Sequence, residues 1–283
     1  MWDEWLRVPI LLGSPFIPYG VKGEVKVKNN YINPEEGGIP SQFEEVWWGT
    51  ECIMGYGIGD SAKLVINDNE IQNGSISAIT MVDHLGECVV KNNEISMGII
   101  DTFYTGNTAT AILAQYAVAF LGGPATPSVG GIMNIRDNHI NCGSQTGIVF
   151  SGFLGNTWSE GCKVNYNIVN MTKMHNIPYM TGCGIRITDV QGAKLLDNTV
   201  KGDGEFALYV GDPPIPPGVP NPFPLMTENN KIIDLSVKRF NSSLGLDVMF
   251  AMDAENNQLK GGKGTYSDGG QNNTSTEGWQ LIE

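Results

Sequence analysis

An arginine, a tyrosine and two aspartates fall at equivalent places of a short recurring motif. The motif is a small residue, an aliphatic residue, any residue and a second aliphatic residue. Arg186 and Tyr209 take the third place of two consecutive copies, and Asp189 and Asp212 follow at the sixth. If the copies stack about 4.8 Å apart, Arg186 neighbours Tyr209 and Asp189 neighbours Asp212. Copies begin at Ala78, Gly147, Gly184, Ala207 and Gly245.

These four residues are the predicted catalytic residues. Two carboxylates about 5 Å apart raise the pKa of one of them and match the spacing of a retaining glycosidase. The same pair, Asp189 and Asp212, is also a predicted Ca²⁺ site, because Ca²⁺ prefers oxygen ligands. The alternative is that aspartate is simply a good turn residue beside glycine, as Asp212 is beside Gly211.

Other candidates are predicted to bind a substrate. Trp47, Trp48 and Trp158 fall in segments expected to be loops, and exposed indoles beside a groove would stack on sugar rings. The alternative is that these indoles cover sheet faces as local apolar clusters. Asp247 takes the third, outward place of the last motif copy and is a further binding candidate.

A second motif indicates the elements that position these residues. It reads apolar, any, apolar, two of any type, asparagine, any, aliphatic, and alternation at period two is typical of strands. The asparagine–aliphatic step then predicts a corner followed by another strand. The copies are Val25–Ile32, Leu64–Ile71, Cys88–Ile95, Met133–Ile140, Cys162–Val169 and Ala193–Val200, with weaker ones at Leu225–Ile232 and Met252–Leu259.

Stacked coils explain why the same residue type returns at the same corner. Each inward aliphatic side chain packs on its equivalents above and below, and the corner asparagines form a hydrogen-bonded ladder. Asparagine also tolerates the left-handed backbone that a tight corner needs. At these motifs the chain resembles the right-handed parallel β-helix proteins of the pectin-lyase-like fold.

The resemblance covers about residues 20 to 260 and implies an all-β, single-domain right-handed solenoid of about eight coils. It also implies a polysaccharide lyase or glycoside hydrolase acting in a surface groove. The alternative is a non-catalytic carbohydrate-binding or structural module. The family's Asp-Asp doublet and Gly-His-Gly motif are absent from this sequence.

Composition limits the partners. With 17 Lys+Arg against 30 Asp+Glu, the formal net charge is −13, which disfavours nucleic acid and anionic membranes. A polysaccharide or oligosaccharide is the predicted partner, and the sequence leaves the oligomeric state open. The predicted cofactor is none, or Ca²⁺.

The cysteines and the first residues bear on localisation. Five cysteines without Cys-x-x-Cys spacing favour buried free thiols over disulfides or zinc. No signal peptide is readable at the first residues, so an extracellular or periplasmic location would require a mature or excised domain. The localisation therefore stays open.

Domain organisation follows from the motifs. We expect an N-terminal cap over residues 1–20, a β-helix over 21–260 and a loose C-terminal tail or cap over 261–283. Segments longer than a corner predict loop excursions at 33–62, 98–130, 151–161 and 170–183, together with the proline-rich stretch Pro213–Pro224. The apolar segment Ala111–Ala114 is expected to be a strand by register.

Overall fold

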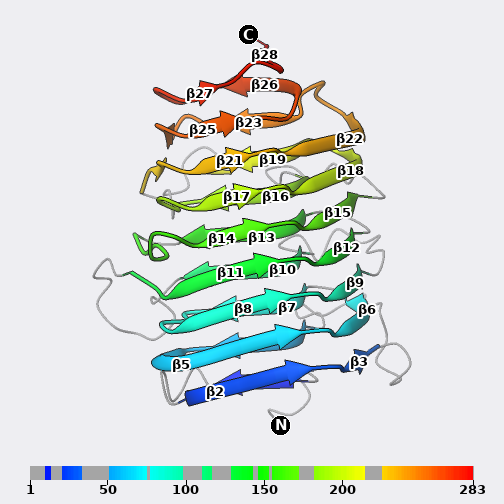
Figure 1. Cartoon of the computed structure of the whole chain (residues 1–283), viewed down its shortest axis with the longest axis vertical. Helices are drawn as coiled ribbons and strands as arrows, with labels where there is room; N and C mark the ends of the chain where they lie inside the picture. Colours follow the sequence, from blue (N-terminus) through cyan, green and yellow to red (C-terminus); the bar gives the residue numbers. More distant parts are fainter. Residues whose placement is uncertain are drawn as a thin grey trace, which may run out of the picture.

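The protein is a solenoid of parallel strands. The computed structural model describes residues 10–13, 21–33, 51–74, 77–97, 110–116, 129–142, 146–152, 155–171, 182–213 and 225–282. In these residues every strand pairing is parallel and no helix occurs, so the predicted all-β parallel β-helix is confirmed. Figure 1 shows the coils stacked one above another, with β2 (Val21–Lys28) and β3 (Tyr31–Ile32) at one end of the stack and β28 (Trp279–Leu281) at the other.

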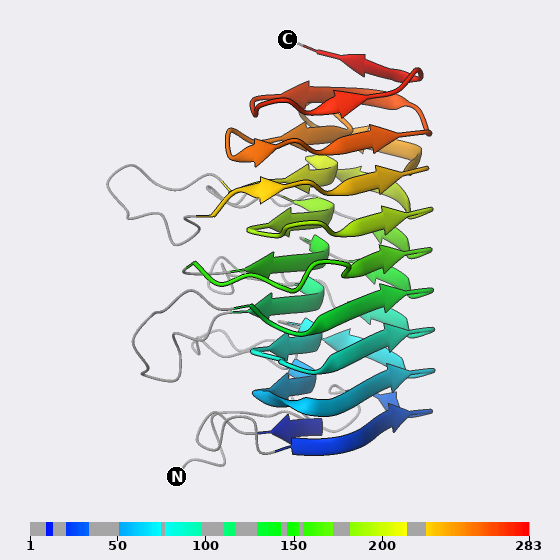
Figure 2. The ribbon, with the colours of Figure 1, turned by 60° about the vertical axis from the view of Figure 1, so that its left-hand side comes forward.

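Three long sheets form the stack, and each of the first seven coils contributes one strand to each sheet in turn (Figure 2). Sheet A contains, in spatial order, β1 (Ile10–Gly13), β4 (Glu51–Tyr56), β7 (Ser77–Val82), β10 (Thr110–Tyr116), β13 (Thr146–Gly152), β16 (Cys183–Thr188), β19 (Phe206–Val210), β23 (Val248–Phe250), β26 (Gly264–Asp268) and β28 (Trp279–Leu281).

Sheet B follows sheet A along the chain. It contains β2 (Val21–Lys28), β5 (Ile58–Asn67), β8 (Glu87–Lys91), β11 (Ile132–Arg136), β14 (Lys163–Asn165), β17 (Lys194–Leu196), β21 (Lys231–Ile233), β25 (Gln258–Lys260) and β27 (Thr274–Ser275).

Sheet C completes each of the first seven coils before the chain returns to sheet A. It contains β3 (Tyr31–Ile32), β6 (Glu70–Gly74), β9 (Glu94–Met97), β12 (His139–Cys142), β15 (Ile168–Met171), β18 (Thr199–Gly204) and β22 (Ser236–Ser242). A fourth, two-stranded sheet pairs β20 (Thr227–Glu228) with β24 (Ala254–Glu255).

The core is a column of aliphatic side chains, because alternate residues of every strand point inward. In sheet A, for example, Ile79, Ile112 and Ile148 are register partners and have no exposed surface. The predicted strand Ala111–Ala114 is therefore confirmed as part of β10. Each inward residue packs on its equivalents in the neighbouring coils, so one continuous core runs along the axis.

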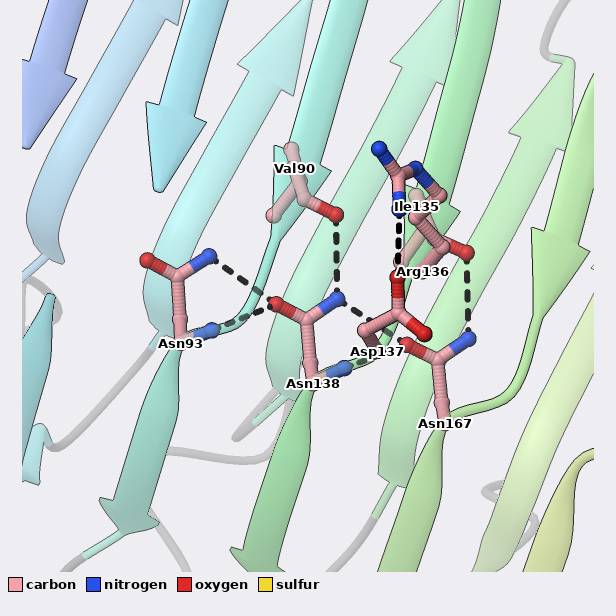
Figure 3. Close-up of polar contacts among 7 residues, drawn as sticks. All are labelled: Val90, Asn93, Ile135, Arg136, Asp137, Asn138 and Asn167. Carbon is pink, nitrogen blue, oxygen red and sulfur yellow. Dashed lines mark hydrogen bonds and ion pairs between the residues drawn. The ribbon is translucent and has the colours of Figure 1, made fainter. Parts of the chain in front are cut away.

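Asparagines at the corner between sheets B and C form the predicted ladder (Figure 3). The Oδ1 atom of Asn138 accepts hydrogen bonds from the backbone N and the Nδ2 of Asn93, at 3.0 and 2.9 Å. The Nδ2 of Asn138 donates to the Val90 carbonyl and to the Oδ1 of Asn167. The ladder comprises Asn30, Asn69, Asn93, Asn138, Asn167 and Asn198.

The left-handed residue of each corner is not the ladder asparagine, so that expectation is wrong. The residue immediately before it has positive φ, as in Asp68 (56°), Asn92 (53°) and Asp137 (57°). Asparagine and aspartate are among the few non-glycine residues that adopt this conformation readily. The corner therefore divides two tasks between two residues: the first turns the backbone and the second makes the hydrogen bonds.

The two weak motif copies belong to a different corner, which corrects the single ladder predicted from the sequence. Asn230 pairs in register with Ala193 rather than with Asn198, and its Oδ1 accepts a bond from the Ala193 backbone N at 2.8 Å. The side chains of Asn230, Asn257 and Asn273 form a second, shorter ladder, at the corner that enters sheet B. At the first corner, the buried Leu235 takes the place of the ladder asparagine in the coil after that of Asn198.

The small residue of the first motif is required by packing. A Cβ atom on Gly184 would lie 2.5 Å from a methyl carbon of Val200 and 2.8 Å from the Ala207 carbonyl oxygen. A Cβ atom on Gly147 would lie 2.4 Å from Val169. The small residue of the motif therefore lies where sheet A approaches the inward side chains of sheet C.

We expect Gly184→Ala to destabilise the fold by about 1–3 kcal/mol, the usual cost of overpacking a close-packed core. Because Val200 is the side chain that the new methyl group meets, Gly184→Ala combined with Val200→Ala should cost less than the sum of the two single changes. Urea unfolding of the three variants measures this coupling. Strictly additive costs would show that Val200 is not the obstacle.

Several segments expected to be irregular are regular strands. Residues 51–62 lie in β4 and β5, joined by a tight corner at Gly57. Within the segment expected to be a loose tail or a cap, β26 and β28 extend sheet A and β27 extends sheet B. Trp279 packs into the end of the core, and its Nε1 donates to the Gly261 carbonyl at 2.6 Å. At the other end, β1 already pairs with β4 inside the predicted cap.

None of the residues described here forms a helix long and apolar enough to cross a membrane.

Candidate functional site

The register of sheet A brings the four predicted catalytic residues together in pairs. Arg186 and Tyr209 are direct partners on β16 and β19. Ile187 pairs with Val210 in the same strands, so Asp189 and Asp212 lie at equivalent places two residues further on, where sheet A ends and the chain turns toward sheet B. The sequence-derived neighbourhood is thus present in the structure.

Asp189 is the most perturbed carboxyl of this region. It has no exposed surface, and neither carboxylate oxygen has a hydrogen-bond partner of good geometry among the described residues. Burial raises the pKa of Asp189 to about 8, and the negative charges of Asp212 and Asp253 add to the shift. The backbone of Leu225 lowers the pKa of Asp189, but less strongly than burial raises it. Asp189 is therefore protonated at neutral pH, chiefly because it is buried rather than because it has an acidic neighbour.

Asp253 is a third carboxylate at this corner and was not predicted. Its Oδ1 accepts a hydrogen bond from the Asp212 backbone N at 2.7 Å, and its Oδ2 accepts one from the Thr227 hydroxyl at 3.2 Å. The Thr227 Oγ1 in turn accepts the Asp189 backbone N–H at 2.8 Å. Thr227 and Asp253 thereby tie three successive coils together.

Two further acids lie at the same corner, closer to sheet B. Glu228 and Glu255 are register partners on β20 and β24, and both side chains are half-buried, whereas the preceding Thr227 and Ala254 are fully buried. We call Asp189, Asp212, Asp253, Glu228 and Glu255 the acidic corner. The repetition Thr-Glu-Asn-Asn and Ala-Glu-Asn-Asn is the sequence signal that would have revealed the glutamate pair.

Arg186 and Tyr209 lie on the outer face of sheet A but are enclosed. Tyr209 is only 4% exposed, packs on Phe206 with ring centroids 5.4 Å apart, and donates its hydroxyl to the Asp212 carbonyl at 2.8 Å. Burial raises the pKa of Tyr209 and lowers that of Arg186. The Arg186 side chain keeps partial exposure, yet its Nε is buried without a hydrogen-bond partner among the described residues.

Aspartate also serves as a turn residue here, as the alternative interpretation proposed. Asp83 and Asp189 both have positive φ, at 55° and 52°, at the end of a sheet A strand. The Asp212 position differs, because the left-handed residue there is Gly211, with φ 117°. The turn role therefore explains the residue type at Asp189 but not at Asp212.

Two of the predicted binding residues occupy other environments than expected. Trp158 is 1% exposed, stacks on Phe150 at 5.6 Å and donates its Nε1 to the Ser151 carbonyl, so it is part of the core and not an exposed indole. Asp247 lies at the corner before β23, and Met249 takes the outward place beside Tyr209.

The Asp247 side chain is engaged in that corner. It accepts the Thr265 backbone N–H at 2.8 Å, so it holds two coils together rather than facing a groove. Trp47, Trp48 and most of Pro213–Pro224 lie outside the described residues.

The acidic corner does not fit the Ca²⁺ that the fold suggested. Among the described residues, no three carboxylate, histidine or cysteine side chains converge as metal ligands. The Asp253 oxygens already accept hydrogen bonds from protein groups, and Asp189 is protonated at neutral pH. Ca²⁺ ligands are ionised carboxylates and other oxygens, so the pair Asp189 and Asp212 does not fit a Ca²⁺ ion.

Other titratable groups are structural. All five cysteines are buried and none is in a disulfide, and burial raises the pKa of Cys162 to about 11. His84 has no exposed surface, and burial lowers its pKa to about 4, so it is neutral at physiological pH. His139 forms an exposed ion pair with Glu94 at 3.0 Å.

The fold and the acidic corner thus define a parallel β-helix with clustered carboxylates at the corner between sheets A and B. Comparisons with models of protein families, with curated proteins and with solved structures gave no match.

Proposed function

We propose that the protein is a pectin-lyase-like, right-handed parallel β-helix that hydrolyses a polysaccharide at the acidic corner. The observation that supports this proposal is the raised pKa of Asp189, about 8, beside Asp212 and Asp253. A protonated carboxyl beside other carboxylates is the combination that glycoside hydrolysis uses.

The chemistry assigns a role to each group. Asp189 donates its proton to the glycosidic oxygen as the bond to the leaving sugar breaks, and Asp212 attacks the anomeric carbon. A water molecule then hydrolyses the glycosyl–enzyme bond and returns a proton to Asp189. Tyr209 positions Asp212, because its hydroxyl donates a hydrogen bond to the Asp212 backbone carbonyl, and Arg186 lies beside Tyr209 on the neighbouring strand β16.

The test is turnover of a panel of neutral and acidic polysaccharides by the wild type, by Asp189→Asn and by Asp197→Asn. Asp197 is a matched control, since it also has positive φ (51°) but lies at the opposite corner of sheet B. We expect reducing ends from the wild type and from Asp197→Asn, and at least a hundredfold loss in Asp189→Asn, within the usual range for general acids. Activity should fall above about pH 8, where Asp189 loses its proton.

Equal activity of Asp189→Asn and the wild type would reject the proposed acid. An unsaturated product, detected by its ultraviolet absorbance, would reject hydrolysis in favour of elimination by a lyase. In that case Arg186, whose pKa burial lowers, is the candidate base.

A non-catalytic carbohydrate-binding module is the second candidate. It is favoured by the burial of the site, because Asp189 is wholly enclosed and Tyr209 nearly so. This candidate predicts that the wild type binds a polysaccharide of the panel and releases no product.

A further inference from the structure

The chain contains a single Asp-Pro peptide bond, between Asp212 and Pro213, and this bond lies at the acidic corner. Such a bond is open to attack by its own side chain, because the aspartate carboxylate reaches its own carbonyl carbon through a five-membered ring. The proline nitrogen is a tertiary amide without an N–H, and it leaves as a secondary amine once it gains a proton. Whether the bond breaks therefore depends on the groups around it.

Protein groups hold the backbone that leads into this bond. The Asp212 backbone N donates to the Oδ1 of Asp253 at 2.7 Å. The Gly211 carbonyl accepts the Thr188 hydroxyl at 2.8 Å, and the Gly211 backbone N donates to the Ile187 carbonyl at 2.9 Å. Gly211 has φ 117°, and a Cβ atom there would lie 2.5 Å from the same Asp253 oxygen, so a larger residue would displace Asp253. The peptide unit is thus held in place before any reaction, which favours an intramolecular attack.

A tyrosine hydroxyl is directed at the carbonyl oxygen of the bond itself. Tyr209 donates its hydroxyl to the Asp212 carbonyl oxygen at 2.8 Å. Negative charge develops on this oxygen when a nucleophile adds to the carbonyl carbon, and a hydrogen-bond donor fixed at that place stabilises it. Burial raises the pKa of Tyr209, so the hydroxyl keeps its proton. The ring packs on Phe206 and is 4% exposed, which fixes the donor.

A proton donor and water are both at hand. Asp189 occupies the place equivalent to Asp212 in the preceding coil, about 4.8 Å away along the stack. Its pKa, raised by burial to about 8, keeps it protonated at neutral pH. Asp212 and Pro213 are only half-buried, so water reaches the bond. The corner therefore supplies a nucleophile, a donor to the carbonyl oxygen and an acid for the leaving nitrogen.

We propose that the folded protein cleaves its own chain between Asp212 and Pro213. The Asp212 carboxylate adds to its own carbonyl carbon, and Tyr209 stabilises the charge on the carbonyl oxygen. The bond to the Pro213 nitrogen breaks, the nitrogen takes the Asp189 proton, and a cyclic anhydride of Asp212 remains. One water molecule opens the anhydride to two carboxylates, and its two protons go to Asp189 and to the released proline amine.

The cleaved protein stays assembled. Strands that follow Pro213 pair with strands that precede it: β21 with β17, β22 with β18 and β23 with β19. The fragments 1–212 and 213–283 therefore share one core and separate only when the fold is lost. Cleavage places a new carboxylate and a new amine at the acidic corner. This activity goes beyond the proposed function, because it requires no polysaccharide.

The experiment incubates the purified full-length protein at neutral pH for several days, with and without unfolding concentrations of urea. Denaturing gels and intact-mass spectrometry measure the fraction cut on isolation and its growth with time. We expect fragments 1–212 and 213–283, with Pro213 as the new N-terminal residue, from the native wild type only. The same native sample should elute from a gel-filtration column as one species.

Four variants test the assigned groups, with urea unfolding to confirm that each is folded. Asp212→Ala should not cut, and Tyr209→Phe and Asp189→Asn should each cut at least about a hundredfold more slowly. Tyr266→Phe is the matched control, since Tyr266 is also a half-buried tyrosine of sheet A, but its hydroxyl contacts Ser275. It should cut like the wild type.

A native wild type that stays intact would overturn the proposal. Equal cutting of the native and the urea-unfolded wild type would also overturn it, because the lability would then belong to the dipeptide and not to the fold. Cutting of Tyr209→Phe as fast as Tyr266→Phe would reject the role of the hydroxyl at the carbonyl oxygen, and with it the site.

Discussion

Asn138→Ala is expected to destabilise the protein by about 3–5 kcal/mol. The change removes the acceptor of two buried donors, the backbone N and the Nδ2 of Asn93, and the donor to the Val90 carbonyl and the Oδ1 of Asn167. A buried polar group left without its partner costs about 1–3 kcal/mol. Because the four lost bonds connect consecutive coils, the loss is expected in the cooperative unfolding of the whole stack, measured by urea denaturation.

The matched control is Asn141→Ala. Asn141 lies three residues further on, on the outer face of sheet C, and takes part in weaker side-chain bonds, to Ser96 at 3.4 Å and from Asn170 at 3.2 Å. Its replacement should cost no more than about 1 kcal/mol. Similar losses in the two variants would show that the ladder position has no special contribution to stability.

Asp189 alone is expected to lower the stability of the wild type by several kcal/mol between pH 4 and pH 8. In the unfolded chain this carboxyl ionises near its ordinary pKa of 3.8, whereas in the folded protein it keeps its proton up to about pH 8. In this interval the folded state binds one more proton than the unfolded state, so its stability decreases by about 1.4 kcal/mol per pH unit. Above pH 8 the loss is complete.

Asp189→Asn should remove this dependence, because an amide keeps the shape of the protonated carboxyl and does not titrate. Urea unfolding of the wild type, Asp189→Asn and Asp197→Asn across this range isolates the effect. His84, whose pKa burial lowers to about 4, acts in the opposite direction below pH 6.5, and comparing variants cancels its contribution. A slope that Asp189→Asn leaves unchanged would contradict a buried, protonated Asp189.

Much of the fold could be predicted because its repeats are local. The asparagine motif spans eight residues, and each copy folds into the same strand–corner–strand unit, so its period was visible without any long-range contact. Asn230 and Asn257 were misplaced because an asparagine corner looks the same wherever it occurs in a coil. Only the pairing of Lys194 with Lys231 reveals that the second ladder enters sheet B rather than leaving it.

The candidate site was predicted only in part, because its register depended on one motif copy. The copies at Gly184 and Ala207 were aligned correctly, which placed Asp189 beside Asp212. The copy at Gly245 was aligned two residues too early, since Leu208 pairs with Val248. Even in the correct register Asp253 lies one residue beyond the place equivalent to Asp212, so the motif did not point to it. The burial of Trp158 and Asp189 depends on packing between distant segments, which a local pattern does not encode.

The positive charge of sheet B, whose strands contain ten of the 17 lysine and arginine residues against three of the 30 acids, was overlooked for a different reason. Most of these cations occupy the variable places of the asparagine motif, where single sequences show no rule. Net charge, taken over the whole chain, concealed that one sheet has the opposite sign. Charge counted face by face after the register is known is thus more informative than charge counted by sequence.

The early end of sheet C has a consequence for self-association. Sheet C stops at β22, whereas sheets A and B continue to β28 and β27, so the last strands of the three sheets lie in different coils. Exposed strand edges are templates for pairing with another molecule. Here β22 presents Lys238 and Arg239, the latter with positive φ, and its pairing with β18 contains a register shift. A second copy stacked on this edge would meet strands at different heights, one of them charged and irregular, which disfavours regular strand pairing at β22.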